Sequence, residues 1–166
     1  MPLLRTSRLL GGRYVTMLRA SLERHPTAEA KAHVRRWLRS WATQRGALLE
    51  EAQTARGLAC DASSLIREMD LACKYVWEIG EVTATPSLYD ATIDWTPMDD
   101  AWADLDAAAE ARIFWEETLP ALARAYNSDL TLELAAPRWR GDPRTQLRVQ
   151  TSNRELPSAN EVAETT

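Results

Sequence analysis

Residues 33–45 read HVRRWLRSWATQR, in which two tryptophans stand one helical turn apart within a dense run of arginines. If this stretch and the residues after it form a helix, the apolar side chains recur at spacings of three, four and seven. This stripe comprises Val34, Trp37, Leu38, Trp41, Leu48, Leu49 and Ala52. The spacing predicts that one face of the helix packs against a core.

A basic ridge runs beside the stripe. Lys31, Arg35 and Arg39 follow one another at i, i+4 and i+8, whereas Arg36 points roughly the other way. Like charges at this spacing destabilise a helix by about 0.2–0.5 kcal/mol per pair, so an acidic partner is expected. Two partners fit, namely carboxylates of the protein itself and the phosphates of a nucleic-acid backbone. The sequence alone leaves both open.

The charge of the chain is divided along its length. Residues 1–45 hold ten Arg or Lys against two Glu, whereas residues 46–126 hold five basic residues against sixteen acidic ones. The net charges of these regions are therefore +8 and −11. Such asymmetry indicates a polyanion-binding arm, or two surfaces that meet each other or successive copies of the chain.

Length and composition indicate one globular domain. The chain has 166 residues, of which 45% are hydrophobic, and we expect a single helical domain over residues 1–151 and a polar tail over residues 152–166. Seven tryptophans suggest that some contact another molecule. Cys60 and Cys73 lack a metal-binding spacing and are expected to be free thiols. No stretch resembles a signal peptide or a membrane span, which favours a cytoplasmic protein.

The predicted elements begin late, because Gly11-Gly12 should keep residues 1–12 irregular. A helix then follows from Arg13 to Pro26, with one face formed by Tyr14, Met17, Leu18, Ser21 and Leu22. The next helix should run from about residue 28 to residue 56, capped by Thr27. A third helix is expected from about residue 61 to Gly80. Residues 81–95 should form an extended loop with a short strand at 92–95.

Thr96-Pro97-Met98-Asp99 is the clearest helix start, because it combines an N-cap, a proline at the first helical position and a carboxylate in the first turn. The helix should continue to about Leu119, with a kink or restart at Pro120. Its outward acidic face is a candidate protein interface comprising Asp100, Asp104, Asp106 and Glu110.

Period-two alternation near residues 130–134 and 146–150 predicts two strands that lie on the helices or are completed by another chain. The expected fold class is therefore mainly α, a helical bundle of about four helices with a small C-terminal β-hairpin-like element.

Residues typical of catalysis are sparse. His25 and His33 have no motif-like Ser, Cys or Asp partner, and the chain lacks GxSxG, P-loop and GxGxxG sequences. The acidic helix lacks the spacing of a known metal site, and its carboxylates are expected to be solvated or docked on basic helices. We therefore expect a non-catalytic protein with no cofactor and no metal.

Two groups of basic residues are candidates for nucleic-acid contact. The first comprises Arg13, Arg19, Lys31, Arg35, Arg36, Arg39 and Arg45. The second is a basic loop in which an aromatic could stack on a base, or in which the tryptophan simply covers the strands, and it comprises Arg138, Trp139, Arg140 and Arg144. No base-reading motif is present, so such binding would follow the backbone without sequence specificity.

The favoured hypothesis is a non-catalytic small helical subunit of a multi-protein nucleoprotein complex, of the kind found in RNA-guided CRISPR effector complexes. This rests on an analogy of size and helical content, with no matching motif. A structural or connector protein of a phage particle is the first alternative, and self-association would then be expected. An inhibitor or immunity protein acting through its acidic surface is the second.

Overall fold

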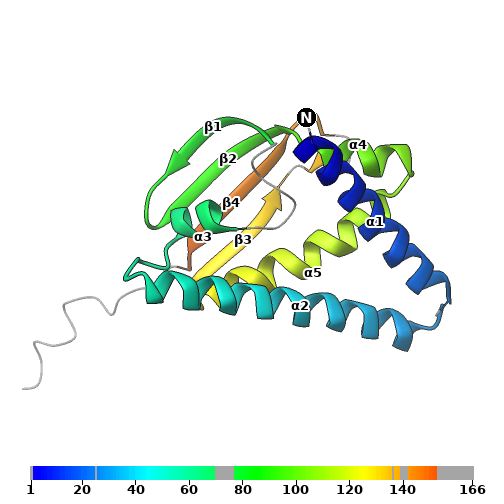
Figure 1. Cartoon of the computed structure of the whole chain (residues 1–166), viewed down its shortest axis with the longest axis horizontal. Helices are drawn as coiled ribbons and strands as arrows, with labels where there is room; N and C mark the ends of the chain where they lie inside the picture. Colours follow the sequence, from blue (N-terminus) through cyan, green and yellow to red (C-terminus); the bar gives the residue numbers. More distant parts are fainter. Residues whose placement is uncertain (1, 25, 70–76, 136, 139–141, 153–166) are drawn as a thin grey trace, which may run out of the picture.

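The computed structural model describes residues 2–24, 26–69, 77–135, 137–138 and 142–152. In chain order the elements are α1 (Pro2–Arg24), α2 (Ala28–Ala55), α3 (Ala62–Glu68), β1 (Glu78–Ala84), β2 (Leu88–Trp95), α4 (Pro97–Asp104), α5 (Ala108–Tyr126), β3 (Leu130–Ala135) and β4 (Thr145–Thr151). The strands form an antiparallel sheet in the order β1-β2-β4-β3, so two hairpins meet along β2 and β4. Helix α5 packs on the sheet, α2 packs along α5, and α1 crosses α4 (Figure 1).

Helices dominate the described chain, as the sequence predicted, but the β element is a four-stranded sheet and not a single hairpin. The strands predicted near residues 130 and 150 are β3 and β4. The short strand predicted at residues 92–95 lies within β2, but the extended loop predicted for the rest of 81–95 is wrong, because most of it belongs to β1 and β2, which turn around Pro86. Strand β2 alternates between buried Ala91 and Ile93 and the more exposed Asp90 and Thr92, so the hairpin supplies part of the core.

Helix α1 begins eleven residues before the predicted start and passes through both glycines. Its close packing on α4 explains this difference. A Cβ atom on Gly11 would lie 3.0 Å from Cγ of Met98, and the indole N–H of Trp102 donates a hydrogen bond to the Gly11 carbonyl at 3.0 Å. The absence of a side chain here lets two helices approach, and tertiary contact overrides a weak helix propensity.

Helix α2 confirms its prediction closely. The Thr27 hydroxyl accepts a hydrogen bond from the backbone N–H of Ala30 at the N-terminus, and Gly57 follows the C-terminus with a φ of 66°. The predicted weak point, Gly46, is buried against α5, where a Cβ atom would lie only 2.3 Å from the carbonyl oxygen of Leu122. This glycine permits the close packing of α2 on α5, the two helices that share the most extensive contact.

The third and fourth predicted helices differ from the structure in extent. Helix α3 ends at Glu68, residues 78–80 belong to β1 and not to a helix, and residues 70–76, with Cys73, lie outside the described part of the chain. The predicted long helix after Thr96 is divided into α4 and α5 at residues 105–107, where Asp106 has a φ of 49°. Pro120 does not end the helix, because α5 continues through it to Tyr126.

The core lies between the sheet and α5 and extends to α1 and α4. Phe114 occupies its aromatic centre, with ring centroids 5.0 Å from Trp115 and 6.3 Å from Trp102. Leu132, Leu147 and Val149 and other inward residues of the strands complete it. Since α5 is the element that both the sheet and α2 contact, its position determines where the N-terminal helices lie.

Candidate functional site

The basic stretch over residues 33–45 contacts a carboxylate of α5. Nη1 of Arg35 lies 2.6 Å from Oε1 of Glu117, and Arg39 forms an ion pair with the other oxygen of the same carboxylate. The Glu117 side chain is 9% exposed. Of the two partners that the sequence left open for Arg35 and Arg39, the structure therefore shows the protein's own carboxylate.

Helix α1 makes equivalent contacts with α4 and α5. Arg8 pairs with Asp104, and Nε of Arg19 lies 2.7 Å from Oε1 of Glu110. Nη2 of Arg19 also donates a hydrogen bond to the carbonyl of Asp106 at 2.9 Å. This bond connects α1 to the segment that joins α4 to α5. The hydrogen bond from Arg19 holds the pKa of Glu110 below its usual value.

The acidic residues predicted as a protein interface thus lie beside α1. Asp104 and Glu110 have partners within the chain, and Asp100 accepts a hydrogen bond at 2.9 Å from the indole N–H of Trp95. Asp106 remains exposed at the α4–α5 link. Their use as an interface with another protein stays a prediction.

The basic loop near residue 140 is only partly described. Nη1 of Arg138 donates a hydrogen bond to the Asp94 carbonyl at 3.0 Å, and Nε of Arg144 lies 3.1 Å from Oδ1 of the same aspartate. Both arginines therefore contact Asp94 near the end of β2. Trp139 and Arg140 lie outside the described residues.

The rest of the predicted basic set lies apart from these pairs. Arg13, Lys31 and Arg36 are exposed and form no ion pair with another described residue, whereas Arg45 is half-buried on α2. Arg24, which the prediction omitted, is likewise exposed in the last turn of α1. The structure thus divides the basic N-terminal region into cations paired with α4 and α5 and cations left at the surface.

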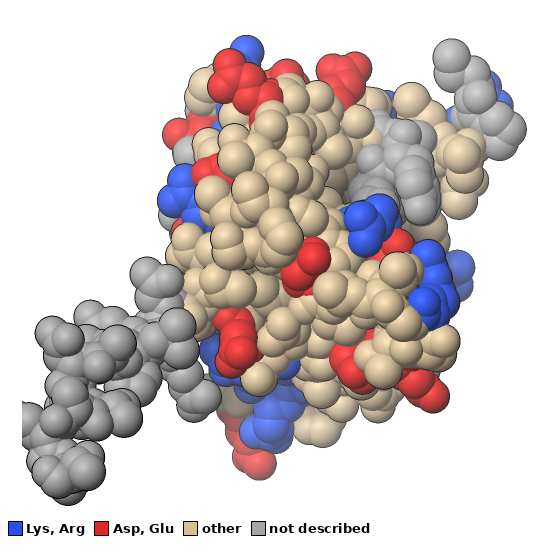
Figure 2. Space-filling model, turned by 90° about the vertical axis from the view of Figure 1, so that its left-hand side faces the viewer, with Lys and Arg blue, Asp and Glu red and all other residues tan. Residues whose placement is uncertain are grey.

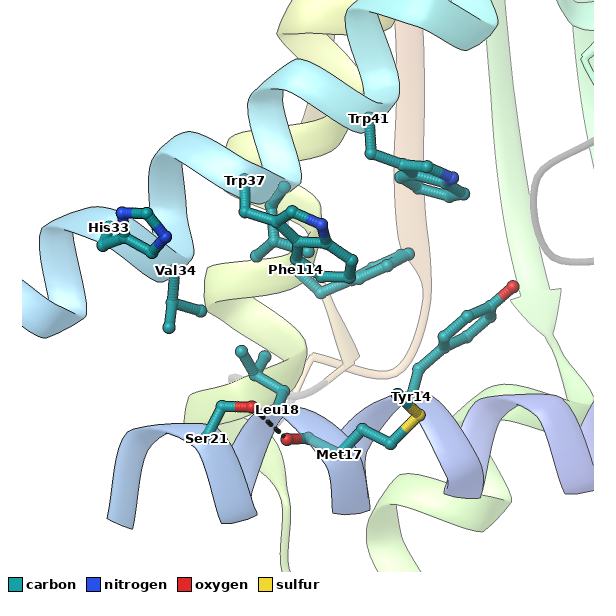
Figure 3. A pocket seen from close by; sticks show the side chains of 10 residues that line it. Tyr14, Met17, Leu18, Ser21, His33, Val34, Trp37, Trp41 and Phe114 are labelled. Atoms are coloured by element: carbon teal, nitrogen blue, oxygen red, sulfur yellow. Dashed lines mark hydrogen bonds between the residues drawn. The ribbon is translucent and has the colours of Figure 1, made fainter. Parts of the chain in front are cut away.

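An apolar groove lies between α1 and α2, and Arg36 borders a pocket next to it. We call this groove the α1–α2 groove. Its volume is about 480 Å³, and it is lined by Tyr14, Met17, Leu18, Ser21, His33, Val34, Trp37, Leu38, Trp41 and Phe114. Figure 3 shows the tryptophans extending from α2 and Tyr14 and Met17 extending from α1 into the space between the helices, with Phe114 of α5 between them.

The walls of the groove are apolar side chains that water reaches. Trp37 is 58% exposed, Met17 is 56% exposed and Tyr14 is 37% exposed. Phe114 forms the floor, and its ring stacks on Tyr14 with centroids 5.6 Å apart and an interplanar angle of 21°. Aromatic contacts therefore hold the floor and one wall in place, while the rest of the groove lies open.

The sequence placed Trp37, Trp41, Leu48 and Ala52 on one inward stripe, and for Trp37, Leu48 and Ala52 this is wrong, because all three are exposed. The stripe is wider than the contact between α2 and α5. Leu38 and Ala42 are therefore buried, whereas Trp37 remains exposed to solvent. The surplus of tryptophan was the available signal that some would face outward. The predicted face of α1 containing Tyr14, Met17 and Ser21 does line the groove.

A second feature lies at the other end of α2. Cys60 is a partly buried free cysteine, and its Sγ lies 3.9 Å from the Glu50 carbonyl. Nearby, the Tyr126 hydroxyl and Oε1 of Gln53 are buried without a hydrogen-bond partner among the described residues. Burial raises the pKa of Tyr126. Cys60 does not line the α1–α2 groove.

The surface at the opposite end of the molecule has a mixed charge. Figure 2 shows the end of the molecule that carries the β1–β2 turn and α3, where basic and acidic residues are scattered over uncharged surface with neither sign forming a broad patch. Within the described ranges, no group of His, Cys, Asp and Glu is arranged to hold a metal ion. The helices of the described chain are also too short or too polar to cross a membrane.

Comparisons with known proteins identify a fold and no family. No protein-family profile and no curated protein sequence matches the chain. Among solved structures, it is similar to a trafficking protein particle complex subunit 3 from Naegleria fowleri, described as covalently bound to palmitic acid. The TM-score is 0.51 and the identity 17%, over 88% of this chain and 95% of that chain.

This likeness contradicts the functions predicted from sequence. Those functions rested on an analogy with helical bundles, whereas the structure has the helix-and-sheet fold of a trafficking-complex subunit. The identification as a CRISPR-complex or phage-particle protein, and the nucleic-acid-binding role assigned to the arginines, are therefore wrong. The ion pairs described above agree with this correction, because Arg35 and Arg39 of the basic stretch both bind the carboxylate of Glu117. The chain is similar in fold to a subunit of a protein complex.

Proposed function

We propose that this protein is a non-catalytic subunit of a protein assembly and that it binds a partner protein through the α1–α2 groove. The observation that carries this proposal is the exposure of large apolar side chains around one hollow, above all Trp37 at 58% and Met17 at 56%. Apolar surface gathered in one place and bordered by polar residues is typical of interaction sites.

The energetics favour a protein partner. Fully burying one large apolar side chain contributes about 1.5–3 kcal/mol, so covering several lining residues would offset much of the entropic cost of association. Tryptophan is also among the residues that most often dominate interface energies. The half-exposed Trp37 over an aromatic floor is therefore suited to anchor a partner.

The fold comparison supports the same proposal. The similar Naegleria protein is a subunit of a complex by its own description. Neither a paired general acid and base nor a nucleophile held by a base is seen in the groove, whose polar lining residues are Ser21 and His33. Binding, rather than chemistry, is the use that these side chains fit.

Site-specific photo-crosslinking tests the proposal. Trp37 and, separately, Met17 are replaced by benzoylphenylalanine in the full chain, which is irradiated in cells of the source organism. Thr131, exposed on strand β3, is the matched control position. We expect the same discrete protein band from both groove positions and none from Thr131.

Different outcomes would overturn the proposal. Crosslinks from residues 17 and 37 to lipid alone, or none at all while the protein remains folded by circular dichroism, would show that the groove does not bind protein. The same band from the Thr131 position would show that capture is not specific to the groove. A crosslink between two copies of this chain would identify the partner as a second copy.

A second candidate function is covalent acylation at Cys60. One observation that favours it is the partly buried free thiol of Cys60 near the buried Tyr126 hydroxyl. The other is that the similar Naegleria protein is described as covalently bound to palmitic acid. Intact-mass spectrometry of the protein from its own organism would show one acyl chain that hydroxylamine releases and that Cys60→Ser removes. An unmodified mass would exclude it, with no bearing on the groove.

A further inference from the structure

We infer that the segment of the partner that enters the α1–α2 groove is an amphipathic helix whose apolar side chains are flanked by carboxylates. The inference rests on the proposed function and adds the chemistry of the partner. Its basis is the way the protein uses its own basic residues around the groove.

The cations that face α4 and α5 already have carboxylate partners within the chain. Arg19 pairs with Glu110, and Arg35 and Arg39 share Glu117. The outward cations have no such partner among the described residues, so their charge is the more readily available for recognition.

The outward cations lie beside the groove. Arg13 precedes Met17 by four residues and Arg24 follows it by seven, so both lie on the side of α1 that lines the groove. On α2, Arg36 borders a shallow extension of about 330 Å³ that shares His33 with the groove. Each of these arginines is exposed and forms no ion pair with another described residue.

Nearby carboxylates only partly offset this charge. Glu29 lines the same shallow extension as Arg36, and Glu23 precedes Arg24 on α1. With Lys31 also exposed on α2, the basic residues around the groove outnumber the acidic ones. A partner with carboxylates on either side of its apolar face matches this surplus.

The groove walls favour a helical ligand over an extended one. Every lining residue belongs to α1, α2 or α5, so no strand edge is present to pair with the backbone of an extended peptide. A helix satisfies its own backbone hydrogen bonds and presents apolar side chains at i, i+4 and i+7. Helices α1 and α2 diverge in Figure 1, and the groove between them is lined by side chains of both helices over the buried Phe114.

The test uses two synthetic helical peptides that share the same Leu and Ala face. One carries Glu beside that face, the other carries Lys, and both are labelled for fluorescence anisotropy with the full-length protein at low salt. We expect the Glu peptide to bind about tenfold more tightly than the Lys peptide, because several rim pairs each contribute modestly. Trp37→Ala should weaken both peptides, since the apolar contact is common to them.

Single charge reversals locate the effect. Arg13→Glu, Arg24→Glu and Arg36→Glu should each weaken binding of the Glu peptide by about two- to fivefold. Arg124→Glu, at an exposed position near the end of α5, changes the net charge equally and should leave the affinity unchanged. Circular dichroism confirms that each variant is folded.

Several results would overturn the inference without affecting the proposed function. Equal affinities for the two peptides, or reversals that act no more strongly than Arg124→Glu, would show that the rim charge does not select the partner. If neither peptide binds while crosslinking at residue 37 captures a protein, the ligand is not a helix of this kind. A stable dimer with Trp37 buried would show that a second copy occupies the groove.

Discussion

Replacing Gly46 by alanine should destabilise the protein, although alanine is the better helix former. Gly46 lies in the middle of α2, where the added methyl would be 2.3 Å from the Leu122 carbonyl oxygen and 2.9 Å from Cβ of Ala125. Both are atoms of α5, and the first belongs to its backbone. Because non-bonded carbon atoms normally lie about 3.5–4.0 Å apart, the two helices would have to separate by roughly 1 Å.

Two effects of opposite sign decide how much Gly46→Ala changes the free energy of unfolding. Alanine gains about 0.5–1 kcal/mol over glycine inside a helix. Overpacking of a filled core costs about 1–3 kcal/mol, and we expect the upper end because a rotamer change cannot relieve a contact with backbone. The net result should be a loss of roughly 2 kcal/mol, or about 4–8 °C in melting temperature for a chain of this size.

Gly12→Ala is the matched control. A methyl at Gly12 would lie 3.7 Å from Cδ1 of Leu105, an ordinary contact, so the helix gain of about 0.5–1 kcal/mol should remain. Urea denaturation followed by circular dichroism compares both variants with the native protein. If Gly46→Ala were as stable as Gly12→Ala, the close packing of α2 on α5 described here would be wrong.

Three further predictions concern the polar contacts. Glu117→Gln should cost about 1–2 kcal/mol in urea denaturation, because it leaves two half-exposed arginines without their carboxylate; an unchanged midpoint would contradict this. The lowered pKa of Glu110 means that its pair with Arg19 stabilises the fold above pH about 4.3, the ordinary value, and that this contribution is lost as pH falls through the lower folded value. The stability difference between native protein and Glu110→Gln should therefore shrink on acidification, and a growing difference would refute the assignment. Asp61→Ala removes the capping box of α3 and should cost about 0.5–2 kcal/mol, measured by thermal melting, whereas no shift would mean that the cap is dispensable.

The sequence predicted elements well where local signals and tertiary packing agree. Helix α2 has an N-cap at Thr27 and Gly57 beyond its end, and the structure matches both of these signals. The start of α4 follows the Thr96-Pro97 signal for the same reason. In these segments the backbone's own preferences already specify the observed conformation.

Prediction failed where a distant contact decides the local conformation. Gly11 looks like a helix breaker until Met98 is seen to pack against it. The sequence predicts only the end of the β1–β2 hairpin, because Pro86 and the β-branched residues around it are also compatible with an extended loop, whereas in the structure Pro86 lies in the turn between two strands. The groove was also out of reach, since it requires α1 and α2 to diverge over Phe114, and no periodicity within one helix specifies the angle between two.

The charge of the basic stretch alone led to a wrong functional prediction. Helical phase, not the number of arginines, determines their roles: Arg35 and Arg39 are four residues apart and reach Glu117 together, whereas Arg36 is one residue on and points to solvent. A similar division holds on α1, where Arg19 faces α5 and Arg13 does not. One run of arginines therefore contains cations that fix the N-terminal helices on the core and cations that remain beside the groove. The paired and the outward arginines lie within the same helical turns. Substituting one paired arginine should therefore change the stability of the fold, and substituting one outward arginine should change the affinity for the partner. Deleting the whole stretch would change both together.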